Sequence, residues 1–264
     1  MTIHHPRVWT ISLLLVLSAG CATVRRQHPV AGFPSSNRAL ADMFITRVVA
    51  RESSLRNIRS RAKISLESPD LDRRVTFRGF MAFATPDRLR VQGHSVLGID
   101  ACDLISNDGA FYLSIPSQKK VFYQREGVAV DGMAFSVSPS DIVREIFIPF
   151  GSVEIRTRNL RIVNRTADTA SIEYTSGSVR RVVTVDRQWR VLNRARYDDG
   201  MLTCTVAMTD YELIDGILFP RHIEAIYPAR KTSITMDLDG VEINRNLDPK
   251  LFEMPVGLQL RKGR

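Results

Sequence analysis

The sequence predicts an α+β domain in which about eleven antiparallel strands form one long, curled sheet, with two helices over its apolar face. Three observations lead to this prediction. Apolar and polar residues alternate with a period of two from about residue 60 to 124, and again after about residue 170. Two other stretches repeat their apolar residues at helical spacing, and turn-forming pairs such as Asp199-Gly200 separate the alternating runs. Because long antiparallel sheets curl, we expect a trough.

The first expected element is a helix over residues 38–56, with Asn37 as its N-cap. Its apolar residues fall on or near one face, and they are Leu40, Phe44, Val48 and Leu55. Basic residues occupy the rest of its surface. This helix therefore has one side that can pack on a sheet.

Six alternating runs follow the helix. Within each run, the apolar residues occupy alternate positions, which we call the inward parity, and therefore point to the same face of the predicted strand. The runs are 60–67, 75–83, 88–92, 99–106, 109–115 and 119–124. Segments with turn chemistry separate them, for example Asn107-Asp108-Gly109. This part of the chain is predicted to be an antiparallel meander with one apolar face.

The alternation stops at Ser138-Pro139, where proline follows a capping serine as at the start of many helices. The apolar stripe of this second helix consists of Ile142, Val143, Ile146 and Phe147. Pro149–Gly151 ends it. Alternating runs then resume around Ile172 and Val183, in 189–197, and in 202–213, 219–227 and 232–243. Because the meander continues on both sides, the helix interrupts one domain and does not separate two.

The N-terminal segment has the features of a secretory signal peptide. Its apolar run, Val8–Ala19, is shorter than the roughly 20 residues that cross a bilayer, and Arg7 precedes it. Ala19-Gly20-Cys21 resembles a bacterial lipobox, in which the signal is removed before a cysteine that carries a diacylglyceryl group. The resemblance implies lipid attachment at Cys21, and Ala22 after it implies sorting to the outer membrane. An ordinary signal peptide with an unrelated cysteine is the alternative.

These features divide the chain into four segments. Residues 1–20 are the expected lipoprotein signal peptide, and residues 21–36, which are rich in Pro, Gly and Ser, are a lipid-anchored tether. Residues 37–258 form the folded domain. Residues 259–264 are a basic tail.

The composition favours a membrane surface over nucleic acid as a charged partner. The formal net charge is +9, and anionic lipid headgroups attract such a chain, whereas an exported protein seldom meets nucleic acid. The basic residues are scattered along the predicted strands, which also fits an ordinary solvated surface. Cys102 and Cys204 could form a disulfide in an oxidising compartment or remain buried thiols, and the sequence leaves both possibilities open.

The sequence contains no recognisable catalytic or metal-binding pattern. His28, His94 and His222 are far apart, and neither a GxSxG motif nor a glycine-rich phosphate loop occurs. Carboxylate pairs such as Asp198-Asp199 fall at turns or on polar strand faces. We therefore expect a protein that is not an enzyme and that uses no metal or cofactor.

The order of these features resembles the LolA/LolB-like family of periplasmic and outer-membrane proteins that carry and receive lipoproteins, above all the LolB-type acceptors. The resemblance runs from about residue 38 to 258. Its most specific part is Leu89–Gly98, which is similar to the strand and protruding loop of the acceptors. Ile142–Gly151 is similar to the lid helix, and residues 241–255 look like the endings of related uncharacterised lipoproteins.

The resemblance implies that Leu97 is the residue that inserts into the membrane. A leucine that folds back onto its own sheet is the alternative. The resemblance also implies an incomplete β-barrel with a helical lid, whose cavity takes acyl chains. By their inward parity, the residues expected to line the trough and its lid are Phe77, Met81, Phe83, Leu89, Val91, Phe111, Leu113, Tyr123, Ile146 and Phe147.

Two functions are compatible with these observations. The first is an outer-membrane-anchored lipoprotein with its body in the periplasm, which binds acyl chains of a lipid or lipoprotein cargo. It would receive this cargo from a periplasmic carrier protein and pass it to the membrane. The second is a non-catalytic, anchored interaction subunit with a filled core. Phe80 and Phe122, whose parity is opposite to that of the apolar face, would then belong to its partner surface.

Overall fold

The computed structural model describes residues 32–69, 71, 74–94, 100–125, 139–147, 155 and 159–254, and these residues belong to one compact unit. Within them, thirteen strands form a single sheet in the order β6-β5-β4-β3-β2-β1-β13-β12-β11-β10-β9-β8-β7. The strands are β1 (Asn57–Glu67), β2 (Val75–Ala84), β3 (Arg88–His94), β4 (Asp100–Asn107), β5 (Ala110–Ile115), β6 (Lys120–Arg125), β7 (Leu160–Arg165), β8 (Thr169–Ser176), β9 (Val179–Asp186), β10 (Val191–Asp198), β11 (Met201–Ile214), β12 (Ile217–Tyr227) and β13 (Thr232–Ile243).

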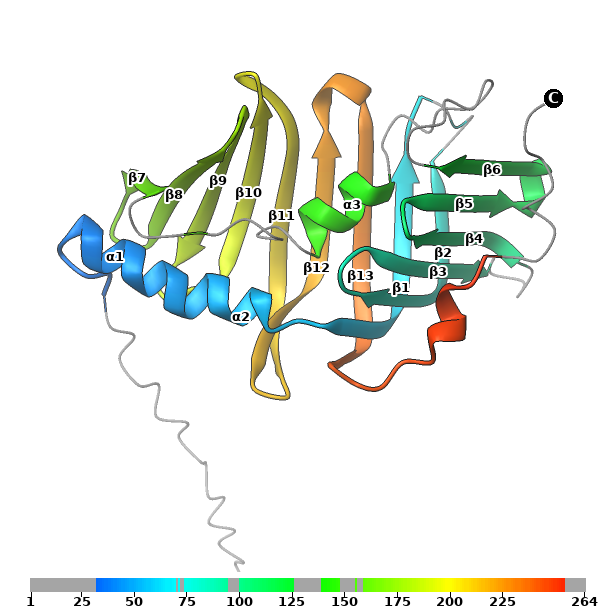
Figure 1. Ribbon diagram of the computed structural model, residues 1–264, viewed down its shortest axis with the longest axis horizontal. Helices are drawn as coiled ribbons and strands as arrows, with labels where there is room; N and C mark the ends of the chain where they lie inside the picture. Colours follow the sequence, from blue (N-terminus) through cyan, green and yellow to red (C-terminus); the bar gives the residue numbers. More distant parts are fainter. Residues whose placement is uncertain are drawn as a thin grey trace, which may run out of the picture. The chain divides into compact units, whose positions relative to one another are not determined.

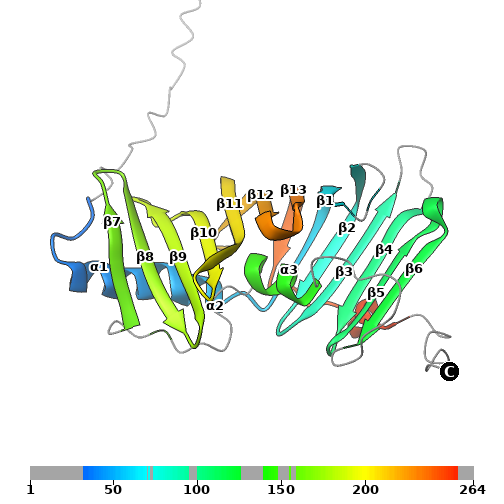
Figure 2. The same ribbon diagram turned by 90° about the horizontal axis from the view of Figure 1, so that it is seen from above.

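The sheet is an open, strongly curved antiparallel structure, as the sequence predicts (Figures 1 and 2). Two meanders, β1–β6 and β7–β13, are joined at its centre by antiparallel pairing of β1 with β13, in which Ile64 lies opposite Met236. Strands β6 and β7 lie at opposite ends of the strand order, so the barrel is incomplete. The strand number exceeds the expected eleven partly because the sequence gives little indication of β7: alternation of apolar and polar residues is weak in Leu160–Arg165.

Three of the hairpin turns have the backbone that their sequences predict. Asp108-Gly109, Asp199-Gly200 and Asp215-Gly216 all have positive φ at both residues. This is the type I′ arrangement, whose twist matches that of the flanking strands. Asp–Gly suits it because glycine has no Cβ to clash and aspartate tolerates the left-handed region.

The first helix is continuous but not uniform. It consists of α1 (Asn37–Phe44), a π-helical turn η1 (Ile45–Val49) and α2 (Ala50–Ser53). The expected cap at Asn37 was wrong by one residue. Ser36 has extended backbone angles, and its hydroxyl accepts a hydrogen bond from the amide of Ala39 at 3.1 Å. The predicted apolar face is confirmed, because Leu40, Phe44 and Val48 are completely buried.

The helices cover only part of the sheet. We call the face that carries them the inner face and the opposite one the outer face. α1 packs on β7, and α3 (Pro139–Ile146) packs on β11. In Figure 1, α1 and α2 run along one end of the β7–β11 half, α3 crosses in front of β12 and β13, and none of these α-helical segments crosses β2–β6. No helix in the described ranges is long and apolar enough to cross a bilayer.

One continuous apolar core lies on the inner face, and a small separate cluster lies on the outer face. The outer cluster forms where a 3₁₀ helix near the C-terminus, η5 (Pro249–Phe252), packs against β2. Phe252 is only 1% exposed and fits against Ala82 and Ala84, with Phe80 at the edge. The chain itself therefore contacts Phe80, one of the two residues expected on a partner surface; the side chain of Phe122 lies outside the described part of the structure.

An apolar groove beside α3

An apolar groove lies on the inner face, in the half of the sheet that the helices leave uncovered. It contains about 760 Å³ of space not filled by protein atoms, part of it open to solvent. Its lining is apolar apart from one thiol, and consists of Ile64, Leu66, Leu71, Val75, Phe77, Met81, Leu89, Val91, Ala101, Cys102, Leu104, Leu113, Ile115, Ile142, Phe147, Ile234 and Met236. An apolar cavity binds water poorly and is suited to apolar ligands.

The alternation of side chains along the strands creates this wall. In β2, Phe77 and Met81 point inward, whereas Arg78 between them is exposed. In β3, Leu89 and Val91 also point inward. The two strands are in register, with Met81 opposite Val91, so equivalent side chains meet on one face. Gly93 leaves the space that the ring of Phe77 occupies, since a Cβ there would lie 2.2 Å from this ring.

At one end of the sheet, the groove wall is partly exposed. Leu66, Val75 and Ala101 lie where β1 ends and β2 and β4 begin, and they are only half-buried. Met81, further along, is completely buried. Beyond it the ring of Phe147, at the end of α3, stacks on Phe83 with 5.1 Å between ring centroids. The shallow end, which we call the rim, is thus the natural entrance, and Phe147 closes the deep end.

α3 separates this apolar region from a charged one. Ile142 and Phe147 face the groove, whereas Glu145 of the same helix is directed to the β9–β10 side. Its carboxylate accepts hydrogen bonds from Arg181 and Arg196, both at 2.9 Å. Burial disfavours the charged form of Arg196, but hydrogen bonds and the charges of Asp198 and Glu145 outweigh this and raise the pKa of its guanidinium above the ordinary value.

Arg194 connects both helical segments to the sheet. Its guanidinium donates to the carbonyl oxygens of Glu145 and Ile146, at 3.4 and 3.3 Å, at the C-terminal end of α3. Positive charge at this end of a helix is favourable. The same group pairs with Glu52 of α2 at 2.5 Å. The arginines therefore hold α3 on the side away from the groove.

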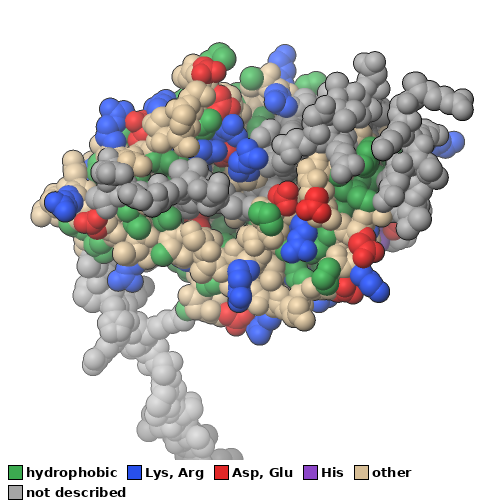
Figure 3. All heavy atoms as spheres, viewed as in Figure 1, with side chains coloured by type: hydrophobic (Ala, Val, Ile, Leu, Met, Phe, Trp, Pro, Cys, Tyr) green, Lys and Arg blue, Asp and Glu red, His purple; other side chains and the backbone are tan. Residues whose placement is uncertain are grey.

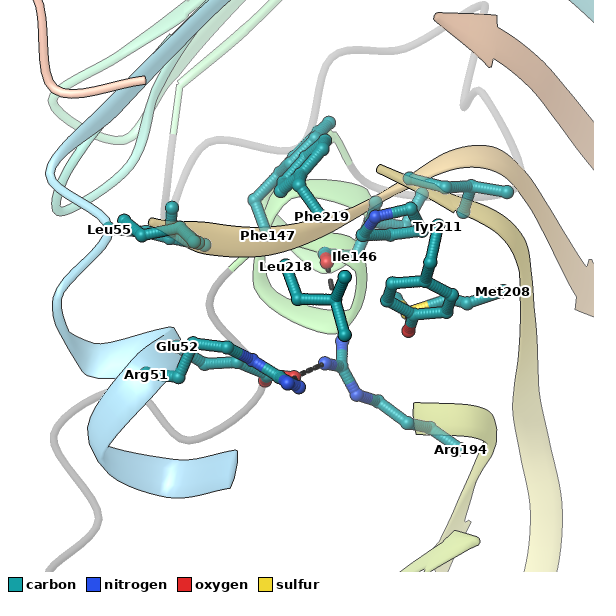
Figure 4. Close-up of a pocket in the computed structure, with 13 residues that line it drawn as sticks. Arg51, Glu52, Leu55, Ile146, Phe147, Arg194, Met208, Tyr211, Leu218 and Phe219 are labelled. Carbon is teal, nitrogen blue, oxygen red and sulfur yellow. Dashed lines mark hydrogen bonds and ion pairs between the residues drawn. The ribbon is translucent and has the colours of Figure 1, made fainter. Parts of the chain in front are cut away.

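A second, smaller pocket lies behind Phe147, between α2, α3 and the β11–β12 hairpin (Figure 4). It contains about 410 Å³ of unfilled space, again including open solvent. Phe147 and Phe219 stand on one side of it, and Arg51, Glu52 and Arg194 on the other. Its remaining lining is mostly apolar and includes Leu218 and Met208.

No family model and no curated protein matches the sequence. Among solved structures, a LolA superfamily protein from Nitrosomonas europaea aligns at 15% identity and a TM-score of 0.53, over 81% of this chain and 97% of that one. A DUF1329 family protein from Desulfovibrio piger aligns at 14% identity and a TM-score of 0.52, over 81% and 95% of the two chains. The chain has the LolA-like fold. The resemblance noted in the sequence is thereby confirmed at the level of the fold.

Six of the ten residues expected in the trough lie on the groove wall of this LolA-like sheet: Phe77, Met81, Leu89, Val91, Leu113 and Phe147. The other four do not. Phe83 lies beneath Phe147, Phe111 is buried in the core, Tyr123 is half-buried, and Ile146 lines the second pocket. Cys21 and Leu97 lie outside the described residues.

The expectation from sequence missed one whole side of the groove. Ile234 and Met236 of β13 contribute to it because β13 pairs with β1, more than 160 residues earlier in the chain. The sequence shows the alternating pattern of this strand but not which strand it lies beside. Leu66, Val75 and Ile115 have the inward parity and could have been included from sequence alone.

Cys102 and Cys204 are both buried, and no disulfide joins them. Cys102 lines the groove, whereas Cys204 lies near Glu145 and Arg181 on the other side of α3. Burial, together with the negative charge of Asp103, raises the pKa of the Cys102 thiol to about 12. This thiol therefore acts as a small apolar group.

Charged side chains on the surface viewed in Figure 3 are scattered, with Lys and Arg among Asp and Glu. Many form exposed ion pairs across neighbouring strands, such as Arg61–Asp239 and Lys63–Asp237 on the outer face. Within the described residues, no group of three or more His, Cys, Asp or Glu side chains has the arrangement of a metal site.

Proposed function

We propose that this chain is a lipid-anchored envelope protein that binds acyl chains of a lipid or lipoprotein in its apolar groove. It would accept this cargo at the outer membrane or transfer it to that membrane. The observation that carries the proposal is the groove itself. It is lined almost entirely by apolar side chains, lies beside a well-packed core, and has half-buried lining residues at the rim. The LolA-like fold supports the same function.

The strength of binding that this groove can provide is compatible with transfer. Each methylene that is fully removed from water contributes about 0.8 kcal/mol. Because the rim residues Leu66, Val75 and Ala101 are only half-buried, an acyl chain would keep part of its surface exposed there. Incomplete burial weakens binding and allows release. The lining provides no nucleotide or metal site, so movement of cargo would follow its affinity for the membrane.

The position at the membrane comes from the sequence. Cys21 is the proposed lipid attachment, Ala22 favours the outer membrane, and the body would face the periplasm. Leu97 belongs to the segment between β3 and β4, whose flanking residues His94 and Asp100 lie at the rim end of the sheet. A membrane-inserting leucine in this segment would bring the bilayer close to the proposed entrance. A periplasmic carrier would deliver the cargo.

The test is photochemical labelling of the full chain in membrane vesicles. A fatty acid with a photoreactive group in the middle of its chain is added, the sample is irradiated, and labelled peptides are mapped by mass spectrometry. We expect label on groove residues such as Met81 and Val91. Ala101→Phe places a ring in the groove and should reduce labelling several-fold, since it removes space that the chain would occupy.

Ala110→Phe is the matched control. It makes the same change on the neighbouring strand β5, but its parity is opposite to that of the buried Phe111 and Leu113. Its labelling should equal that of the unmodified chain. Absence of label from the groove of the unmodified chain, or equal labelling of both variants, would reject the proposal. The interaction-subunit alternative would then stand.

A further inference from the structure

Phe147 is a wall of both cavities. It lines the apolar groove on one side and the second pocket on the other. Its ring is 4% exposed and stacks on Phe83 with an interplanar angle of 15°. Stacking on a completely buried neighbour fixes the position of the ring. The two cavities therefore meet at a single, well-held aromatic side chain.

The groove has a direction. Three half-buried lining residues, Leu66, Val75 and Ala101, lie at the rim, whereas Met81 and Phe147, further along the groove, are buried. An amphiphile that enters from the rim leaves its polar end in water there, because the lining offers it no polar partner. Its terminal methyl group then points toward Phe147.

The space behind Phe147 can accept an apolar chain on the side next to the ring. Leu218, Phe219 and Met208 provide apolar walls there. The charged group formed by Arg51, Glu52 and Arg194 stands on the opposite side (Figure 4). These charged side chains form ion pairs with one another and hydrogen bonds to backbone carbonyl oxygens. A longer acyl chain would therefore extend along the apolar side of the pocket.

We propose that Phe147 determines the length of acyl chain that the groove accepts. The terminal methyl group of a bound chain stops against its ring, and the pocket behind the ring stays empty. Removing the ring joins the two cavities and shifts the preference toward longer chains. This inference rests on the proposed binding function and adds to it a residue that sets specificity.

The expected size of the shift follows from burial. A methylene that moves from water into an apolar site improves binding by about fourfold. In Phe147→Ala, a chain about two carbons longer than the preferred one should therefore gain roughly fifteenfold relative to it. In the unmodified chain the extra carbons have to remain in water at the rim, so they bring no comparable gain.

The experiment uses fatty acids of roughly 12 to 20 carbons that carry a diazirine at the terminal carbon. They are mixed in equal amounts with membrane vesicles that contain the full chain, and after irradiation the labelled peptide and the attached chain length are identified together. In the unmodified chain, label should fall on groove residues and on Phe147. In Phe147→Ala, the longer chains should label Leu218 and Phe219 and should increase relative to shorter ones.

Two further variants make the test specific. Phe111→Ala removes an equally buried ring of the same core that lines neither cavity, so it should lower stability without changing the length preference. Leu218→Trp added to Phe147→Ala refills the second pocket and should restore the original preference. Should Phe147→Ala fail to fold, Phe147→Leu retains more of the packing and has the same expected direction.

The outcomes separate the inference from the function on which it rests. Labelling of the groove with an unchanged length preference in Phe147→Ala or Phe147→Leu overturns the role of Phe147 and leaves the binding function intact. Equal shifts in Phe147→Ala and Phe111→Ala also overturn it, because the effect would then come from general loosening. No groove labelling in the unmodified chain overturns the binding function itself.

Discussion

Glu145 places a carboxylate between two guanidinium groups on the buried inner face. Its side chain is 5% exposed, and those of Arg181 and Arg196 are 11% and 17% exposed. Removing one member of a buried ion pair leaves the remaining charge without compensation and typically costs about 3–5 kcal/mol. We expect Glu145→Leu to lower the free energy of unfolding by about this amount, and Glu145→Gln by less because the amide oxygen still accepts a hydrogen bond.

Urea unfolding measures the difference. Asp239→Asn is the control, because it removes the partner of Arg61 in an ion pair whose side chains are 76% and 67% exposed. Such surface pairs contribute about 0–1 kcal/mol, so this variant should be nearly as stable as the unmodified chain. Similar losses in Glu145→Leu and Asp239→Asn would show that burial of the Glu145 cluster does not contribute to stability as argued.

Cys102 provides a reporter inside the groove. The thiolate is the form that reacts with iodoacetamide, and the raised pKa of about 12 keeps its fraction small. Between about pH 8 and 10, alkylation of Cys102 in the folded protein should rise about tenfold per pH unit, whereas in denaturant it should level off above the ordinary pKa of about 8.5. Peptide mass spectrometry quantifies the reaction. A plateau near pH 9 in the folded protein would contradict the buried position.

Residue parity accounts for the groove positions that could be predicted and for those that could not. It identified Phe77, Met81 and Leu113 because their strands are regular. In β10 a register shift between Val191 and Asn193 changes the parity, so Arg194 points inward. Tyr197, six residues after Val191 and at an equivalent alternate position in the sequence, lies under the guanidinium of Arg180, 3.8 Å from the ring centroid. A bulge of this kind leaves no clear mark in a single sequence.

At the scale of elements, the C-terminal segment stabilises the outer face of the sheet. Phe252 packs against Ala82 and Ala84, and its carbonyl oxygen accepts a hydrogen bond from Asn107. Deleting a buried phenylalanine side chain typically costs about 3–5 kcal/mol. Phe252→Ala should lower stability by about this amount and expose Phe80, so binding of a hydrophobic dye should increase while groove labelling remains. Unchanged dye binding would show that Phe80 is covered by another part of the chain.

Element types were easier to predict than element neighbours. Both helices and most strands follow from local periodicity and turn chemistry, which act over a few residues. The central pairing of β1 with β13 depends on contacts between the two ends of the domain, and no local signal specifies it. That pairing brings Ile234 and Met236 to the groove. The location of the site thus depended on the least predictable contact of the fold.

At the scale of the whole molecule, the two halves of the inner face have different roles. The β7–β11 half is covered by helices and bound to them through Arg194 and Glu145, so it forms a fixed support. The other half carries the apolar groove, which no helix of the described residues fills. The sequence predicted a trough but could not distinguish an open from a filled one, because the same inward residues serve both. Whether the trough is open or filled depends on which half of the inner face the helices cover.

The proposed anchor determines where this groove can act. The carbonyl oxygens of Phe33 and Ser35 accept hydrogen bonds from Arg165 at the edge strand β7, which ties the end of the tether to the body. Only about eleven residues remain between this point and Cys21, and such a segment spans at most roughly 40 Å. An anchored body would therefore stay beside the bilayer, where released acyl chains can enter it directly.

Cys21→Ser removes the proposed attachment and should abolish incorporation of labelled palmitate. The protein should then be released into the periplasm or accumulate with its signal uncleaved, since processing of a lipoprotein signal requires the modified cysteine. Cys204→Ser is the control, because it removes a buried thiol of the body and should keep both the label and the membrane fractionation. Palmitate incorporation into Cys21→Ser, or recovery of the unmodified chain solely in the inner membrane, would contradict outer-membrane anchoring through this residue.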